Sequence, residues 1–580
     1  CLDLGIMYPP GPSGEIQGSV RLTGLETKCV RATGITKVNG CLVIGGSAAL
    51  EDISLPNLIS VEGKFQLIAN DAVNVVSVPN LSNATLISII DSIGGNSGNG
   101  TSIRFEDLSE IARIELVGNK GLADVQLPAL EVLKGSLHIT SNDALTGLDL
   151  PKLANITQDF IFAYNCKATK LEAPALVGVG EDFEVFGNEA LERIVAPDLV
   201  EIHEDMEVYE NPSLVALGGD DLRSLRMVEE DLEIWKMTAL LSVELPSLCS
   251  VGEDLELFDD FLLNDVRLPA LEHVEEDFEM YLLNSISNFE FPALKYIGED
   301  LLVFGNPKLT SLTGMGNLTS LGEGGGGGVL IENNRALTKI FFPNLVGLGN
   351  HSERCDDNDG TKQVELYAGA TDVPMTGSRP LQVSWNPALT SVSMPALTGL
   401  RTNAWVQYNE VLEEFNIDAV EVLNAVYFVF RHNAPEFGNV SLAFGNEQGP
   451  RLRQPELSNL YCNTESFCMP PEPAPWADPQ CSVASNWCPD PCWATELQPR
   501  EDPDRMYAIP GCTPGQPLDC TNAFYLYMRE NDFDFEENMV YPRTAPQFSA
   551  IHAGTYRTSP AGASGRCDPA RTATGPATVA

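Results

Sequence analysis

Residues 174–188 read PALVGVGEDFEVFGN, and nearly the same phrase returns as PALEHVEEDFEMYLLN at 269–284 and as PALKYIGEDLLVFGN from residue 292. The prolines that open the phrase recur with a period of 23 at positions 128, 151, 174 and 197, and again at 246, 269 and 292. A Leu-rich repeat of this period predicts a solenoid, here of about sixteen coils between residues 40 and 437. Weaker copies fill the gaps, anchored at Glu106, Arg223, Gly316 and Asp418, with a looser one near Thr371.

Each coil follows the pattern P-x-L-x-x-[IV]-x-x-D-[LF]-x-[VIM]-x-x-N-x-x-L. Polar and apolar residues alternate with period two around the aspartate, which predicts a short strand, and no coil has room for a helix. Strands of successive coils then pair in parallel. An asparagine recurs fourteen residues after the anchor, and we expect its side chain to bond the backbone of a neighbouring coil. The members of this column are Asn70, Asn142, Asn165, Asn188, Asn211, Asn306 and Asn409.

The stretch LPALEVLKGSLHITSNDALTGLDLPKL (127–153) resembles the coils of receptor L domains, the ligand-binding domains of insulin- and EGF-type receptors. It is still more similar to the fungal cell-wall, sporulation-specific leucine-rich family. The resemblance covers roughly residues 40–437 and implies an all-β fold, a right-handed parallel β-solenoid. Because these relatives include both receptors and wall proteins, it implies little about function. The chain lacks a furin-like cysteine array and a GPI tail, so membrane attachment is not carried over.

Composition and cysteine spacing divide the chain into four predicted parts. These are an N-terminal cap (1–39), the β-solenoid (40–437), a linker (438–455) and a small Cys/Pro-rich, disulfide-stapled module (456–580). The net charge is 35 − 81 = −46, which repels nucleic acid and anionic lipid and suits cations, basic partners or neutral glycans. No run of 18 apolar residues is present, so no membrane insertion is expected. The start at Cys1 indicates a processed or partial N-terminus.

Cysteines and glycosylation sequons predict secretion to the cell surface. Eight of the 14 cysteines follow residue 461, a density typical of oxidising compartments. Cys166 and Cys249 lie alone and are expected to be free, buried thiols. The predicted disulfide cysteines are Cys29, Cys41, Cys462, Cys468, Cys481, Cys488, Cys492, Cys512, Cys520 and Cys567. N-linked glycans are expected at Asn80, Asn83, Asn99, Asn155, Asn317, Asn350 and Asn439.

Three outward positions of the strand form columns that folding alone does not require. Residues nine and eleven positions after the anchor point inward, so positions eight, ten and twelve point outward together. We call these outward columns the acidic–aromatic face. Position eight holds Asp182, Asp205, Asp231, Asp254, Asp277 and Asp300; position ten holds Glu184, Glu207, Glu233, Glu256 and Glu279; position twelve holds Phe186, Tyr209, Trp235, Phe258, Tyr281 and Phe304.

Each column can be interpreted either as a feature of folding or as a binding feature. The aspartates can cap a turn or bind Ca²⁺ at low affinity, and the glutamates can be a solvated face. Stacked like charges nevertheless repel by roughly 0.9 kcal/mol per pair even in water, which favours a cation or a basic partner. Stacked rings stabilise one another by about 0.2–1 kcal/mol per pair, but six outward rings also form an apolar strip of the kind that marks contact sites. The sequence therefore predicts a binding or assembly face here.

Motifs for catalysis are absent, and no cofactor other than weakly bound Ca²⁺ is expected. CDDNDG at 355–360 resembles a calcium loop but begins with cysteine, so an acidic turn is favoured. Carboxylates without interleaved basic residues argue against a polysaccharide-acting enzyme. The sequence predicts a non-enzymatic extracellular structural or adhesive protein of a surface, wall or fibre, whose partners are copies of itself or other surface proteins and glycans and whose open ends would allow filaments. The alternative is a receptor-type ectodomain that binds a protein or glycan through the acidic–aromatic face.

Overall fold

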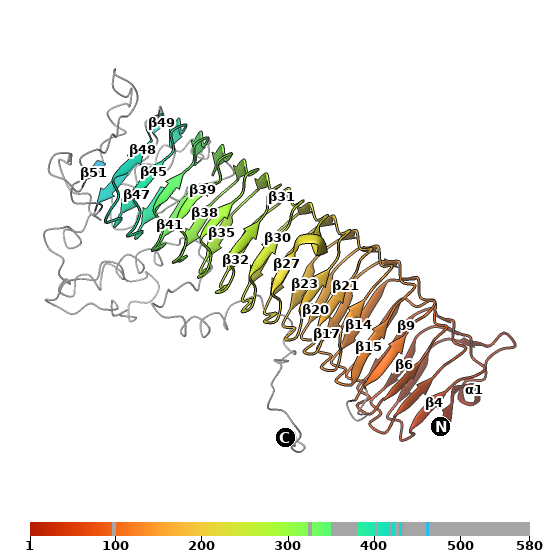
Figure 1. Ribbon diagram of the computed structural model, residues 1–580. Helices are drawn as coiled ribbons and strands as arrows, with labels where there is room; N and C mark the ends of the chain where they lie inside the picture. The colour runs from red at the N-terminus through yellow and green to blue at the C-terminus, as the bar shows by residue number, and fades with distance from the viewer. Residues whose placement is uncertain are drawn as a thin grey trace, which may run out of the picture. The chain divides into compact units, whose positions relative to one another are not determined.

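The computed structural model describes residues 1–94, 100–322, 327–349, 381–400, 404–417, 419–420, 422–423, 428–431, 433 and 460–462. Its regular structure is nearly all β-strand, and parallel stacked coils form a β-solenoid of about sixteen turns (Figure 1). The predicted fold class is therefore confirmed. The described residues belong to two compact units: Cys1–Tyr296 with Phe304–Asn317 form unit 1, and Ile297–Val303 with residues from Leu318 onward form unit 2.

The coil that begins at Pro174 shows how the sequence builds one turn. It contains β22 (Gly178–Val179), β23 (Phe183–Phe186) and β24 (Arg193–Val195), each paired in parallel with an equivalent strand of another coil. Phe183, for example, pairs with Phe160 on one side and with Met206 on the other, and each partner lies one repeat period away. This register places equivalent residues side by side, so the period of the fold is the period of the sequence.

The core of each coil consists of the residues predicted to point inward. Phe183 and Val185 are 1% and 0% exposed. The weak copies are also genuine coils, because their anchoring apolar residues are 1% exposed or less: Leu108, Leu225, Leu318 and Val420. Burial of such columns supplies the hydrophobic stabilisation that a helix-free repeat needs.

The predicted asparagine column is a hydrogen-bonded ladder inside the stack. The side-chain carbonyl of Asn165 accepts a bond from the backbone amide of Asn142 at 3.2 Å, and its Nδ2 donates to the carbonyl of Ile139 at 2.8 Å. The side chain of Asn188 makes the equivalent bonds to Asn165 and Phe162. Each asparagine thereby satisfies a backbone donor and a backbone acceptor of the preceding coil. All seven predicted members are 0% exposed, so their structural role is confirmed.

The turn that leads from the strand to the ladder asparagine has a second feature, which was not predicted. The residue immediately before the ladder position has a positive φ in coil after coil, for example 66° at Gly187 and 54° at Tyr164. Glycine adopts this conformation without strain, and Gly118, Gly187 and Gly305 hold it before ladder asparagines. The left-handed residue turns the chain out of the strand, and the buried asparagine then bonds the backbone exposed by the turn.

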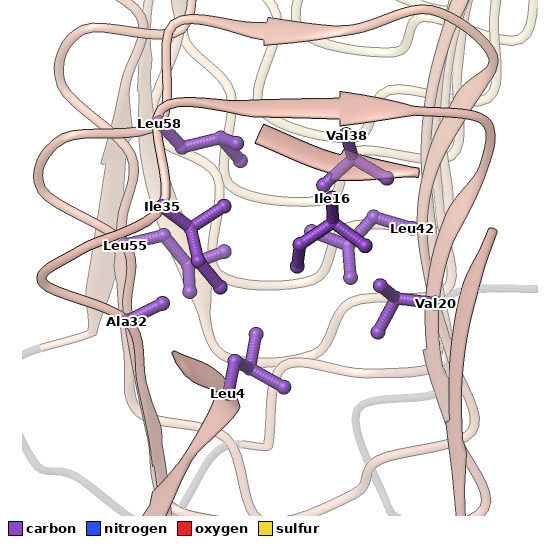
Figure 2. A pocket seen from close by; sticks show the side chains of 9 residues that line it. All are labelled: Leu4, Ile16, Val20, Ala32, Ile35, Val38, Leu42, Leu55 and Leu58. Carbon is purple, nitrogen blue, oxygen red and sulfur yellow. The ribbon is translucent and has the colours of Figure 1, made fainter. Parts of the chain in front are cut away.

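The predicted N-terminal cap continues the coil stacking rather than forming a separate fold. β1 (Leu2–Asp3), β2 (Glu15–Gln17) and β3 (Val20–Thr23) pair in parallel with β4 (Cys29–Arg31), β5 (Lys37–Asn39) and β6 (Leu42–Gly45). The short helix α1 (Leu4–Met7) is capped by Asp3, whose carboxylate accepts from the amide of Gly5. Leu4 turns into the coil interior, where it meets Ile16, Val20 and Leu42 around a cavity of about 10 Å³ (Figure 2). That volume suits one water molecule at most.

Unit 2 contains an interruption in the repeat. Val329 of β41 (Val329–Glu332) pairs directly with Leu381 of β44 (Leu381–Ser384), so adjacent strands of the stack are separated in sequence by more than two repeat periods. Thr371, near which a looser copy of the repeat was predicted, lies outside the described residues.

The other elements of unit 1 form parallel ladders. The strand series that carries the acidic–aromatic face continues with β9 (Lys64–Ile68), β11 (Leu86–Ile90), β14 (Arg113–Val117), β17 (Leu137–Thr140), β20 (Phe160–Ala163), β26 (Met206–Tyr209), β29 (Leu232–Trp235), β32 (Leu255–Phe258) and β35 (Phe278–Tyr281). A second series is β13 (Glu110–Ile111), β16 (Val132–Leu133), β19 (Asn155–Ile156), β25 (Glu201–Ile202), β28 (Met227–Val228), β31 (Ser250–Val251) and β34 (His273–Val274).

A further series begins with β12 (Thr101–Arg104), β15 (Leu122–Gln126), β18 (Leu148–Asp149) and β21 (Lys170–Glu172), and after β24 comes β27 (Ala216–Gly218), β30 (Ser242–Glu244), β33 (Asp265–Arg267), β36 (Asn288–Glu290) and β39 (Ser311–Gly314). Near the N-terminus lie β7 (Asp52–Ser54), β8 (Ser60–Val61) and β10 (Val75–Ser77), and the 3₁₀ helix η1 spans Gly219–Leu222. The remaining strands are β37 (Tyr296–Ile297), β38 (Leu301–Phe304), β40 (Ser320–Leu321), β42 (Lys339–Phe341), β43 (Gly347–Leu348), β45 (Ser391–Ser393), β46 (Gly399–Leu400), β47 (Ala404–Gln407), β48 (Glu414–Asn416), β49 (Val422–Leu423), β50 (Phe428–Arg431) and β51 (Leu460–Cys462).

Candidate interaction face

The strand register brings the predicted outward residues of unit 1 into columns. Glu184 pairs with Glu207, Glu207 with Glu233, and the series continues through Glu256 to Glu279. The aromatic residues two positions later follow the same register. The strands that carry them, β23 to β35, lie side by side in Figure 1.

The rings of the aromatic column form a continuous stack. Centroid separations run from 4.3 Å between Tyr209 and Trp235 to 5.5 Å between Trp235 and Phe258, and the planes of these pairs are inclined by 8° and 6°. Tyr281 and Phe304 extend the stack at 4.6 Å. At the other end Phe186 stacks on Tyr209 and meets the edge of Tyr164 at 5.2 Å. Such stacking stabilises neighbouring coils against one another.

The prediction that these rings form an exposed apolar strip is wrong for most of the column. Trp235 is 5% exposed, Phe258 2%, Tyr281 4% and Phe304 3%, while Phe186 and Tyr209 are half-buried. Period-two alternation correctly gives the direction of a side chain relative to the sheet, but it says nothing about what covers that side chain.

The aspartate column is a second coil-to-coil ladder. A carboxylate oxygen of Asp231 accepts a hydrogen bond from the backbone amide of Asp254 at 2.8 Å, and Asp254 accepts from the amide of Asp277 at 2.7 Å. Asp205 and Asp182 make the equivalent bonds to Asp231 and Asp205, and in unit 2 Asp300 accepts from Gly328. These aspartates thus have a structural role, but their bonds join one coil to the next where a strand begins, whereas the sequence predicted a cap on a turn.

Burial and mutual repulsion raise the pKa of several carboxyl groups in these columns, among them Glu184 and Asp254. Burial, followed by the charge of Glu207, raises the pKa of Glu184 to about 8. Burial and the neighbouring Asp277 raise the pKa of Asp254 to about 8, although the amide bond from Asp277 favours the charged form. Both groups therefore hold a proton in the folded protein at pH values where an ordinary carboxyl is ionised.

The described residues contain no group of three or more His, Cys, Asp and Glu side chains placed to hold a metal ion. Most of the aspartates proposed as calcium ligands already accept a hydrogen bond from a backbone amide: Asp182, Asp205, Asp231 and Asp254. The fifth, Asp277, is the next member of the same column. Residues 355–360 lie outside the described residues. Calcium binding stays a prediction.

The disulfide prediction needs two corrections. Cys29 is bonded to Cys1, and Cys41, which was also predicted to be a disulfide cysteine, is a half-buried free thiol. The reason is register: β1 pairs with β4 so that Leu2 lies opposite Val30, which sets the preceding cysteines side by side. Cys166 is disulfide-bonded rather than free. Cys249 is free as predicted, although half-buried. The side chains of the eight cysteines after residue 461 lie outside the described residues.

The predicted glycosylation sites that the structure describes are accessible. Asn80, Asn83, Asn155 and Asn317 are all exposed or half-buried at the surface, as a glycan acceptor must be. Asn99, Asn350 and Asn439 fall outside the described residues. Within the described part of the chain, no helix combines the length and apolar character needed to cross a membrane.

Comparison with known proteins gives no family. No model of a protein family matches the chain, and a search of curated proteins finds no match either. The resemblance to receptor L domains and to the fungal wall family therefore stays a prediction.

Proposed function

We propose that the chain is a non-enzymatic extracellular protein with a structural or adhesive role at a cell surface, wall or fibre. The observation that carries this proposal is that the polar residues recurring in the coils bond the backbone of neighbouring coils. The buried asparagines bond the backbone of the preceding coil, and the aspartates accept from the amide of the next one. Repeating polar residues devoted to joining coils favour a stiff spacer over a site that must move.

Secretion is supported by the cysteines and the sequons. Cys1 and Cys29 are bonded, and Cys166 belongs to a second disulfide. Disulfides persist mainly in oxidising compartments. The accessibility of four sequon asparagines, Asn155 among them, agrees with the same location.

The architecture of a solenoid favours the proposed assembly. Its coils end in unpaired strands unless a cap or another molecule covers them. A contact between opposite ends of two copies does not close and yields a filament. The proposed partners are therefore copies of this chain or other surface proteins and glycans.

The second candidate is a receptor-type ectodomain that binds its ligand through the acidic–aromatic face. The unbroken glutamate column from Glu184 to Glu279 favours it, because a row of carboxylates suits a basic ligand. The deep burial of Trp235 and Phe258 weighs against direct contact of a ligand with the rings.

The test is expression of the full chain through a eukaryotic secretory pathway, followed by negative-stain microscopy over a range of protein concentrations. We expect secreted, glycosylated protein and filaments or end-to-end oligomers that lengthen with concentration. An Asn155→Gln/Asn317→Gln variant should migrate faster by two glycans and still assemble. Monomers at every concentration would refute self-assembly, and retention in the cell without glycans would refute the location.

A further inference from the structure

One boundary between coils of unit 1 lacks a backbone hydrogen bond that its neighbours have. At the ladder corner, the turn between a strand of the acidic–aromatic series and its ladder residue, the residue with positive φ donates its amide to a carbonyl of the next coil. This bond measures 3.0 Å from Tyr164, 3.4 Å from Glu210 and 3.4 Å from Asp259. No such bond joins the amide of Lys236 to the carbonyl of Phe258, although the structure describes both residues. The gap lies at the boundary between β29 and β32.

The side-chain ladder is interrupted over the same coils. Three consecutive ladder positions hold Met237, Asp260 and Leu283 instead of asparagine. A ladder asparagine donates from Nδ2 to a carbonyl of the preceding coil, as Asn211 does to Val185 at 2.7 Å. Methionine and leucine side chains have no donor, and aspartate has one only when it carries a proton. The boundary between β29 and β32 therefore also lacks the amide donor that joins most other coils.

The aromatic stack is widest at this boundary. The ring centroids of Trp235 and Phe258 are 5.5 Å apart, compared with 4.3 Å between Tyr209 and Trp235 and 4.8 Å between Phe258 and Tyr281. Ring stacking, the backbone bond and the side-chain ladder are thus all weakened between the same two coils.

Elsewhere the same two coils are closely bonded. Where the strands begin, the amide of Leu232 donates to the carbonyl of Asp254 at 2.8 Å. In the second strand series, the amide of Cys249 donates to the carbonyl of Arg226, also at 2.8 Å. The weakness is therefore confined to the ladder corner and does not extend around the coil.

We propose that the boundary between β29 and β32 is a hinge in the solenoid, at which the two coils open at the ladder corner and stay bonded along their other sides. Asp260 favours the opening, because it is 0% exposed and its Oδ2 has no hydrogen-bond partner among the described residues. Water admitted by the opening would supply that bond. The hinge does not rest on the proposed function, and it adds a bending point to coils that are otherwise firmly joined.

Hydrogen exchange of the full chain, with its disulfides intact and read at single-residue resolution, tests the hinge. Exchange protection, corrected for intrinsic rates, reports how often each amide opens. We expect it to be about tenfold lower at Ile234 and Met237 than at the equivalent Val185 and Asn188, the factor that one or two hydrogen bonds supply. Equal protection in the two coils, or a minimum at another boundary of this strand series, would overturn the proposal.

Restoring the missing donor should close the hinge. Asp260→Asn places an amide group where it can bond the carbonyl of Ile234, so protection at Ile234 and Met237 should rise about tenfold while that of Val185 stays the same. The matched control, Asp143→Asn, makes the same chemical change at an exposed position and should alter none of these values. An equal rise in every coil would indicate stabilisation of the whole stack and refute a local hinge. Exchange is measured on the folded monomer, so its outcome is independent of the microscopy that tests assembly.

Discussion

The backbone amide of Met237 donates a hydrogen bond to a carboxylate oxygen of Asp260, at the ladder position where most coils carry asparagine. Asp260 is 0% exposed, and its second oxygen has no hydrogen-bond partner among the described residues. An asparagine at this position, such as Asn306, uses its Nδ2 to bond a carbonyl of the preceding coil, and the equivalent carbonyl for residue 260 is that of Ile234. A carboxylate can bond that carbonyl only when it carries a proton.

We therefore predict that Asp260→Asn stabilises the protein at neutral pH, by about 1–3 kcal/mol in free energy of unfolding, because it satisfies a buried group. Burial raises the pKa of Asp260 well above 3.8. The folded protein therefore keeps the full stabilising contribution of this group below pH 3.8 and loses stability as the pH rises and the carboxyl group ionises. The gain should thus shrink as the pH falls toward 4. Urea unfolding at pH 4.5 and 7.5 measures it, and a gain that is independent of pH would contradict the protonated state.

Removing a ladder asparagine should have the opposite effect. Asn188→Ala leaves the amide of Asn165 and the carbonyl of Phe162 without their partners inside the stack. We expect a loss of about 2–5 kcal/mol in free energy of unfolding, since each unsatisfied buried group costs about 1–3 kcal/mol. The control is Asn264→Ala, at an exposed asparagine whose side chain donates to the carbonyl of Leu262, two residues away in the same coil. Similar losses for the two variants would argue against the ladder.

The glutamate column should make the protein less stable in mild alkali. The pKa of Glu184 is raised from 4.5 to about 8, so stability is complete below about pH 4.5 and declines as the pH rises through 8. Glu184→Gln should reduce this loss of stability with rising pH, whereas replacing the exposed Glu131 with glutamine should not. Denaturation midpoints at pH 5, 6.5 and 8 give the slope, and stability that rises over this range in the wild type would be the contrary result.

Calcium should counteract the same repulsion. Ten carboxylates from Asp182 to Glu279 occupy five adjacent rungs, and divalent ions neutralise neighbouring charges better than monovalent ions do. We expect the thermal midpoint to rise more with millimolar calcium than with sodium at equal ionic strength. If the two salts shift the midpoint equally, the effect is screening and no binding is involved.

The aromatic stack should contribute to stability more than a surface ladder would. Trp235 is 5% exposed and stacks between Tyr209 and Phe258. Trp235→Ala should therefore cost about 3–5 kcal/mol, the usual loss for a buried large ring, and the half-buried Phe186→Ala should cost less. Thermal unfolding and sedimentation of the Trp235→Ala/Tyr209→Ala variant separate two roles. A loss of association without a loss of stability would favour the contact-site interpretation instead.

Some of these features could be read from the sequence and others could not. In a stack, each residue neighbours its equivalent one coil away, so the period, the inward pair Phe183 and Val185, and the ladder asparagines are visible as repeats. The partner of Cys29 was missed because the first coil is longer than the repeat period, which hides the register that sets Cys1 beside it. The burial of Trp235 was missed because repeats encode contacts between coils and not what lies over them.

The direct pairing of Val329 with Leu381 has a practical consequence for protein engineering. The stack accepts an insertion longer than one whole coil at a single corner and resumes in register immediately afterwards. A closed loop pays an entropic cost that grows only slowly with its length. The corner after β43 is therefore a natural graft point, at which a foreign peptide or a small domain can replace residues 350–380 while the coils on either side keep their pairing.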